Sequence, residues 1–106
     1  LCERGISAPH THRETSRYLL DIQAIPALRE LTNFPIISDP SHASFWAPWV
    51  PSLAYASVAA GVDGLIIETH PNPSKSKVDP LQPLNFNTFK KVFKNIKSLH
   101  RLTKKF

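Results

Sequence analysis

Short apolar runs alternate along this chain with longer stretches in which apolar and polar residues recur at helical spacing. Three runs are short and continuous enough for buried strands: residues 1–2, 36–38 and 64–69. Three stretches have the spacing of helices: residues 26–31, 52–60 and 86–102. In the last of these, Phe89, Phe93 and Ile96 recur at steps of three and four, and lysines fill the other face.

Capping and turn residues support these boundaries. Pro26 and Pro51 suit the first turn of a helix, where the missing N–H has no partner to lose. Gly61 suits the end of the second helix, and Asn85 is a favourable N-cap for the third. Between these elements we expect three connections: a polar loop at 7–13, a short helical turn within 15–24, and a long loop at 71–84.

The order of elements indicates a fold class. A strand followed by a helix, repeated three times, is typical of βαβ units with parallel strands. Continuous apolar strands are typical of parallel sheets that are covered on both faces. We find no internal repeat beyond this alternation and no domain boundary. The sequence therefore predicts one α/β unit built on a parallel sheet.

Composition narrows the function classes. The 106 residues are 42% apolar and 20% charged, as in a small globular domain. No apolar run approaches the roughly 20 residues that span a bilayer, so we expect no transmembrane helix. The single cysteine, Cys2, cannot form an internal disulfide, and we expect it to be buried. A reducing, cytoplasmic location is the expectation that follows.

The net charge of +5 comes largely from basic residues near the end of the chain, at positions 90–105. Such a tail could contact nucleic acid or an acidic membrane. It lacks the interleaved aromatic residues and glycines of nucleic-acid modules. We interpret it as a solvated helix face and expect no nucleic-acid partner and no membrane partner.

Candidate chemistry gathers where the strands end. In parallel α/β folds the site lies at the carboxyl ends of the strands. Arg4 follows the first predicted strand, His42 follows the second, and Glu68 ends the third, with Asp79 in the next loop. One nitrogen and two carboxylates suit Mn²⁺, Fe²⁺ or Zn²⁺. A single histidine or glutamate at such a position is more often a solvated or capping residue, and Arg4 could equally be an anion-binding fork or half of a surface ion pair.

Four motifs in order carry a family resemblance: LCERGI, SDPSHA, AAGVDGLIIETHPNP and VDPLQPL. They resemble the C-terminal part of the 3-deoxy-D-arabino-heptulosonate 7-phosphate (DAHP) synthases. They are also similar to the related 3-deoxy-D-manno-octulosonate 8-phosphate (KDO8P) synthases. The resemblance covers nearly the whole chain and implies the last three βα units of a (β/α)₈ TIM barrel, within residues 1–106.

The resemblance also implies roles for individual residues. His42, Glu68 and Asp79 match three ligands of a divalent metal, with His42 and Glu68 as catalytic residues. The family's fourth ligand, a cysteine, lies on an earlier strand, so Cys2 is not its match. Arg4 matches an arginine that holds the phosphate of phosphoenolpyruvate. The implied reaction joins phosphoenolpyruvate to erythrose 4-phosphate and opens the shikimate route to aromatic amino acids.

Alternatives stay open at this point. The motifs DPSH and LQPL favour a DAHP synthase, whereas ETHP also occurs in KDO8P synthases, which use arabinose 5-phosphate. SFWAPWVP and SKVDP differ from the family's usual segments, in which glycines and basic residues are common. A non-catalytic remnant that binds an anion or a partner is a third possibility. We expect the full-length enzyme to be a homo-oligomer, and a 106-residue C-terminal piece to be inactive alone.

Overall fold

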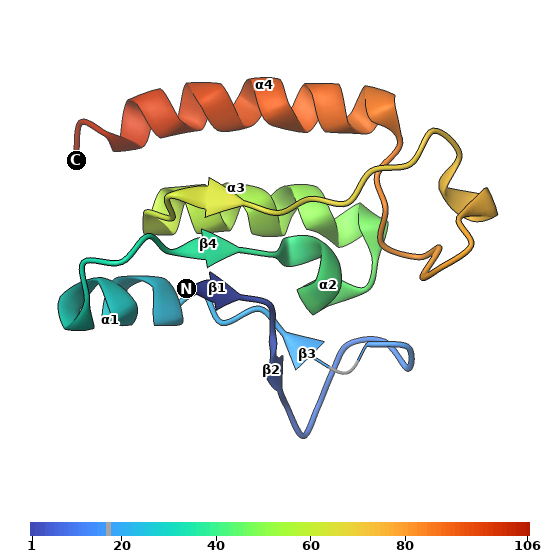
Figure 1. The fold of residues 1–106 in the computed structure, drawn as a ribbon, viewed down its shortest axis with the longest axis horizontal. Coiled ribbons are helices and arrows are strands. Elements are labelled where there is room, and N and C mark those ends of the chain that lie inside the picture. Colours follow the sequence, from blue (N-terminus) through green and yellow to red (C-terminus); the bar gives the residue numbers. More distant parts are fainter. Residues whose placement is uncertain (17) are drawn as a thin grey trace.

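The computed structural model describes residues 1–16 and 18–106. Three short strands form a parallel sheet in the order β1-β4-β5: β1 (Cys2–Glu3), β4 (Ile37–Ser38) and β5 (Gly64–Leu65). Cys2 pairs with Ile37, and Ile37 pairs with Gly64. The predicted α/β class and the parallel order are confirmed. Among the described residues the sheet does not close into a barrel (Figure 1).

The three predicted helices are present, with small shifts of their ends. They are α1 (Ala24–Leu31), α3 (Val50–Ala60) and α4 (Phe86–Thr103). Gly61 ends α3 with a φ of 98°, and the Asn85 side chain caps α4 by accepting from the Thr88 N–H at 2.8 Å. The turn and capping residues thus identified these boundaries correctly.

Several short elements were not predicted. Tyr18–Leu19 forms β3, which pairs antiparallel with β2 (Ile6–Ser7), so the expectation of a helical turn is wrong there. A five-residue helix, α2 (Pro40–Ser44), follows β4 directly, and a 3-10 turn (Ala47–Trp49) leads into α3. The loop at 71–84 contains one more 3-10 turn, Pro73–Lys75.

The two faces of the sheet have different surroundings. Ile36 and Ser38 are fully buried toward the helices, and the Ser38 hydroxyl lies 2.8 Å from the hydroxyl of Ser57 on α3. Side chains alternate between faces along a strand, so Cys2 and Ile37 share the opposite face. Cys2 is exposed there, contrary to the expectation of burial. The pKa of the Cys2 thiol is raised above its ordinary value, mainly because the sheet partly desolvates the thiol. The negative charge of Asp39 is the second cause.

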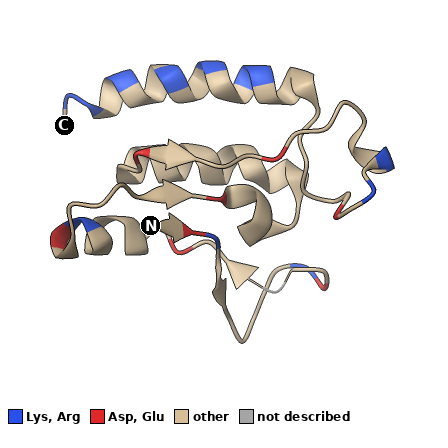
Figure 2. Ribbon diagram, in the orientation of Figure 1, with Lys and Arg blue, Asp and Glu red and all other residues tan. Residues whose placement is uncertain are grey.

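Two apolar clusters join the helices to the sheet. One consists of Ile25, Ile36, Val58 and Val62, and the other of Val50, Ala54, Leu84 and Val92. On α4, Val92 is buried and Phe89 and Ile96 pack against the second cluster, but Phe93 is 52% exposed. The lysines and arginine of α4 follow its outer side (Figure 2), as the solvated-face interpretation predicts. Within the described residues, no helix has both the length and the apolar character to cross a bilayer.

The amino ends of β4 and β5 are joined by a polar contact. The Asp63 carboxylate accepts from the Ile36 N–H at 2.7 Å and from Arg29 at 2.8 Å, while the Asp63 N–H donates to the Ile36 oxygen at 2.8 Å. The pKa of Asp63 is held below its ordinary value, mainly by the hydrogen bond from the Ile36 N–H and secondly by the hydrogen bond from Arg29. This contact lies at the end of the sheet opposite to the candidate site.

Gly5 lets the chain turn sharply after β1. Its φ is 105°, a left-handed conformation that favours glycine. A Cβ atom at Gly5 would lie 2.8 Å from Tyr18 Cβ and 3.1 Å from Ala43 Cα. The missing side chain therefore lets the β2-β3 hairpin pack against α2 beside the carboxyl ends of the strands.

Candidate active site

The amino end of α2 is built around Asp39. Its carboxylate accepts the backbone N–H of His42 at 3.0 Å, and Pro40 occupies the first helical position. An aspartate N-cap followed by proline is a strong start signal for a helix. The aspartate accepts one of the unpaired N–H groups of the first turn, and the proline has no N–H to leave unpaired. Asp39 is 1% exposed, so its charge must be balanced locally.

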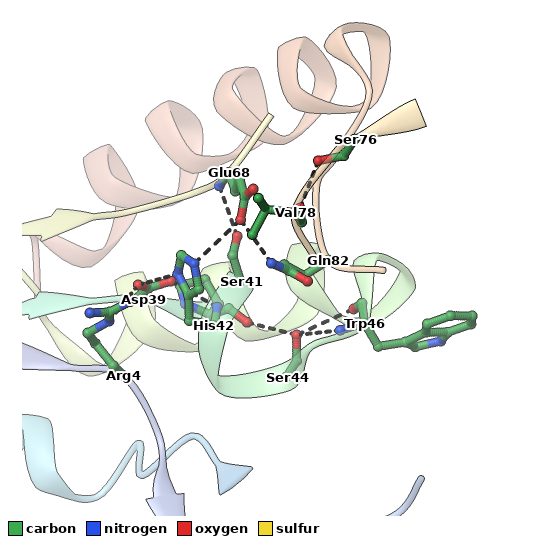
Figure 3. A network of polar contacts seen from close by, with 11 residues as sticks. Arg4, Asp39, Ser41, His42, Ser44, Trp46, Glu68, Ser76, Val78 and Gln82 are labelled. Carbon is green, nitrogen blue, oxygen red and sulfur yellow. Dashed lines mark hydrogen bonds and ion pairs between the residues drawn. The ribbon is translucent and has the colours of Figure 1, made fainter. Parts of the chain in front are cut away.

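Two cationic or polar side chains provide that balance. His42 Nδ1 lies 2.7 Å from Asp39 Oδ2, and Arg4 Nε donates to the same oxygen at 3.1 Å (Figure 3). A carboxylate beside Nδ1 favours the tautomer with the proton on that atom. The other ring nitrogen, Nε2, is then left with a free lone pair.

Glu68 faces this nitrogen from the extended segment after β5, a strand that is shorter than the predicted 64–69. Its Oε2 atom lies 3.5 Å from His42 Nε2. The Glu68 N–H donates to the Ser41 hydroxyl at 3.0 Å, and its backbone oxygen accepts from the Leu84 N–H at 2.9 Å. The main chain of Glu68 is therefore fixed on both sides, by α2 and by the segment that leads into α4.

Gln82 makes a further contact with the same carboxylate. Its Nε2 donates to Glu68 Oε2 at 3.0 Å, and the residue is 1% exposed (Figure 3). Among the described residues, Gln82 Oε1 is buried and has no hydrogen-bond partner. Arg4, Asp39, His42, Glu68 and Gln82 thus form one continuous chain of polar contacts.

Arg4 is the solvent-facing end of this chain. Its side chain is 59% exposed, and the described contact with Asp39 uses only Nε. A guanidinium carries its other N–H donors on the two Nη atoms, in a fork that matches phosphate or carboxylate oxygens. Arg4 is therefore both half of an ion pair and a group that can still bind an anion. The two interpretations left open by the sequence are compatible.

Asp79 is not gathered with the other predicted ligands. It is exposed in the 71–84 loop with a φ of 47°. The part of the chain that the structure describes holds no group of three or more His, Cys, Asp or Glu residues placed to bind a metal. The structure thus brings together His42 and Glu68, but not Asp79.

The other side chains near the rim have different partners. His70 Nδ1 accepts from the Asn72 N–H at 2.9 Å, which makes it part of a local turn. The Arg13 guanidinium lies 3.5 Å from the ring centroid of Trp46, a cation–π contact between the β2-β3 loop and the segment after α2. His10 and His12 form an edge-to-face pair, with ring centroids 5.4 Å apart, in the same loop.

Sequence reasoning missed Asp39 and Gln82 as site residues. Asp39 was visible in the DPSH motif, where an aspartate followed by proline signals a helix N-terminus that would carry His42 three residues later. Gln82 was visible only as a polar residue in the LQPL motif. No local pattern predicts that the chain folds back there to pair Leu84 with Thr69.

The donor set fits a divalent cation at His42 and Glu68. Two ligands about 2.1 Å from a tetrahedral ion lie about 3.4 Å apart, and the observed separation is 3.5 Å. Asp39 orients the imidazole in the way that metal-binding histidines are usually oriented. The pair supplies one nitrogen and one oxygen donor, as intermediate divalent ions prefer.

Comparison with known proteins identifies the family of the chain. Residues 1–105 match the DAHP synthetase I family. The chain is 40% identical, over 93% of its length, to a phospho-2-dehydro-3-deoxyheptonate aldolase of Thermotoga maritima. It is 32% identical, over 98% of its length, to a 2-dehydro-3-deoxyphosphooctonate aldolase of Burkholderia multivorans. It spans 28% and 38% of these two relatives, respectively.

Solved structures show the same likeness. The crystal structure of the Thermotoga maritima DAHP synthase matches 95% of this chain with a TM-score of 0.86 and 39% identity. A truncated form of that enzyme matches equally well. The chain covers 29% and 37% of these two structures, respectively. From the match of its sequence and of its fold, the chain belongs to the DAHP synthetase I family.

Proposed function

We propose that this chain is the C-terminal part of a barrel domain that acts as a 3-deoxy-7-phosphoheptulonate (DAHP) synthase. The reaction is the condensation of phosphoenolpyruvate with erythrose 4-phosphate. The observation that carries the proposal is the contact chain from Arg4 through Asp39 to His42 and Glu68, at the carboxyl ends of three parallel strands in a member of this family. The identity to the Thermotoga maritima enzyme supports the choice of substrates.

Arg4 is proposed to bind the phosphate of phosphoenolpyruvate. Its bond to Asp39 holds the guanidinium in one orientation, while most of the side chain faces solvent. A positioned guanidinium lowers the repulsion between two anionic substrates held close together. C3 of phosphoenolpyruvate can then bond to the aldehyde carbon, water adds at C2, and phosphate leaves by C–O cleavage.

His42 and Glu68 are proposed to bind a divalent metal, Mn²⁺, Fe²⁺ or Zn²⁺, with Asp79 as a third ligand. Such an ion supplies Lewis-acid polarisation of the aldehyde carbonyl. Asp39 keeps the His42 Nε2 atom available, and Ser41 holds the main chain of Glu68 beside it. Asp79 is retained on the family match of its motif, because the described residues do not gather it with the other two.

The second candidate is a KDO8P synthase, which uses arabinose 5-phosphate. The 32% identity to the Burkholderia multivorans enzyme favours keeping it.

The full-length protein is proposed to be a cytoplasmic homo-oligomer that binds neither nucleic acid nor membrane.

The test is an assay of the full-length gene product for phosphate release from phosphoenolpyruvate. Erythrose 4-phosphate and arabinose 5-phosphate are compared, each with and without EDTA. Activity with erythrose 4-phosphate that EDTA abolishes and Mn²⁺ restores is the expected result. Preference for arabinose 5-phosphate would assign the second candidate. No phosphate release with either aldose would leave a binding role without catalysis.

A further inference from the structure

Gln82 is a buried polar residue of the LQPL motif to which the proposed function assigns no role. It lies in a segment that is anchored at both ends. The Leu81 oxygen accepts from the Ala47 N–H at 2.8 Å, and Leu84 exchanges backbone hydrogen bonds with Glu68 and His70 at 2.9 and 3.0 Å. The Gln82 amide is therefore held next to the Glu68 carboxylate by the fold itself (Figure 3).

The orientation of this amide follows from its neighbour. Gln82 Nε2 lies 3.0 Å from Glu68 Oε2. The reversed amide would place its oxygen against a carboxylate oxygen, which has no proton to donate. The contact thus identifies one oxygen of Glu68: the atom that accepts from Gln82 is also the atom 3.5 Å from His42 Nε2.

The same orientation leaves Gln82 Oε1 buried without a partner among the described residues. A buried, unpaired carbonyl weakens a fold, and an apolar side chain of similar shape would avoid that cost. Gln82 is therefore a poor choice for packing alone. Its value lies in the bond that its other amide atom makes.

We propose that Gln82 is a positioning residue that sets the rotation of the Glu68 carboxylate and so presents it, with His42, to a divalent cation. This inference rests on the proposed function, because it assumes that Glu68 and His42 bind the ion. Without the amide, the carboxylate turns toward solvent, since the Glu68 side chain is already 32% exposed. Residues that orient metal ligands in this way commonly change metal affinity by about 10- to 100-fold when they are replaced.

The test uses Gln82→Met in the full-length protein, because methionine keeps the length of the side chain and removes the amide. Gln23→Met is the matched control, since Gln23 is the exposed residue before α1 and its side chain makes no capping bond. Two quantities are measured for each variant: the Kd for Mn²⁺ by titration calorimetry, and the Tm of the metal-free protein. We expect Gln82→Met to bind Mn²⁺ about 10- to 100-fold more weakly, with a Tm equal to or above that of the wild type.

A double-mutant comparison tests whether Gln82 affects Mn²⁺ affinity through the Glu68 carboxylate or independently of it. In the Glu68→Ala background, Gln82→Met should cause no further loss of Mn²⁺ affinity, because the carboxylate that it orients is gone. An equal further loss there, wild-type Mn²⁺ affinity in Gln82→Met, or a lower Tm of the metal-free variant would each overturn the proposal. A wild-type protein that binds no Mn²⁺ would instead refute the proposed metal site, and the inference with it.

Discussion

His42 is bound to Asp39 twice, through its ring and through its main chain. Nδ1 lies 2.7 Å from one carboxylate oxygen, and the backbone N–H donates to the other oxygen at 3.0 Å. A residue that caps a helix therefore also orients the imidazole that the helix carries. Local folding and site geometry depend on one buried side chain.

Asp39→Asn should separate these two roles. Asparagine is also a good N-cap, so α2 should still begin at this residue, while the Tm should fall modestly because Arg4 Nε loses its acceptor oxygen. The neutral amide no longer favours a proton on His42 Nδ1, and we expect the affinity for Mn²⁺ to fall about 10- to 100-fold. Asp21→Asn is the control, because Asp21 also accepts a backbone N–H near a helix start, from Ala24 at 3.1 Å. Equal Mn²⁺ affinities in the two variants would contradict this role for Asp39.

Arg4→Gln should affect substrate binding more than folding. The KM for phosphoenolpyruvate is expected to rise about tenfold or more, since a charge-assisted hydrogen bond to the phosphate is lost. Stability should fall only modestly, because the buried Asp39 carboxylate loses the Arg4 donor but keeps its two contacts with His42. Arg29→Gln, at the opposite end of the sheet, should leave the KM unchanged, and its stability should change little because the Arg29–Asp63 ion pair is exposed on both sides. Steady-state kinetics and thermal unfolding of both variants decide the matter.

Asp79 offers a test of the third proposed ligand. Glycine adopts a φ of 47° without the cost of roughly 1 kcal/mol that a side chain incurs. Asp79→Gly should therefore leave the metal-free protein as stable as the wild type, or more so. If the carboxylate binds the ion, Asp79→Gly and Asp79→Asn should both weaken Mn²⁺ binding about tenfold or more. Unchanged affinity in both would remove Asp79 from the site.

Much of the fold was predictable because its signals are local. Helical spacing, Pro51, Gly61 and Asn85 identified α3 and α4 from neighbouring residues in the chain. Strand ends also predicted that Arg4 and His42 would meet at one rim, and they do so through Asp39.

The errors have a common physical cause, which is contact between segments far apart in sequence. The β2-β3 hairpin depends on the close approach that Gly5 permits, and residues 18–19 alone carry no such signal. The position of Gln82 depends on the backbone pairing of Leu84 with the Glu68–His70 segment.

Asp63→Asn should lower stability in a pH-dependent way. The folded pKa of Asp63 lies below its ordinary value of 3.8, so the ionised form is favoured in the folded state. Its contribution is complete above that ordinary value and disappears as pH falls through the lower folded pKa. The difference in unfolding free energy between wild type and Asp63→Asn should thus be constant near neutrality and shrink below about pH 4. Glu30→Gln, an exposed substitution on α1 that removes the same charge, is the control for the loss of one negative charge.

Gly5→Ala and Gly61→Ala form a matched pair for backbone strain. Both positions have a left-handed φ, 105° and 98°, so each substitution should cost roughly 1–2 kcal/mol. A Cβ at Gly61 meets nothing within 4 Å, whereas one at Gly5 meets Tyr18 and Ala43. Gly5→Ala should lose about 1–3 kcal/mol more in denaturant unfolding, from steric overlap. Equal losses would mean that the hairpin moves away without cost.

The hydrogen bond from the Leu84 N–H to the Glu68 oxygen makes this amide a natural reporter. It can exchange its proton for deuterium only when the segment carrying Gln82 separates from the third strand end. Its exchange rate therefore gives the free energy of opening at the site, with no label attached and no substrate present. Ligands that tighten this end of the sheet should slow exchange at Leu84, while the Asp63 amide at the other end serves as the internal reference.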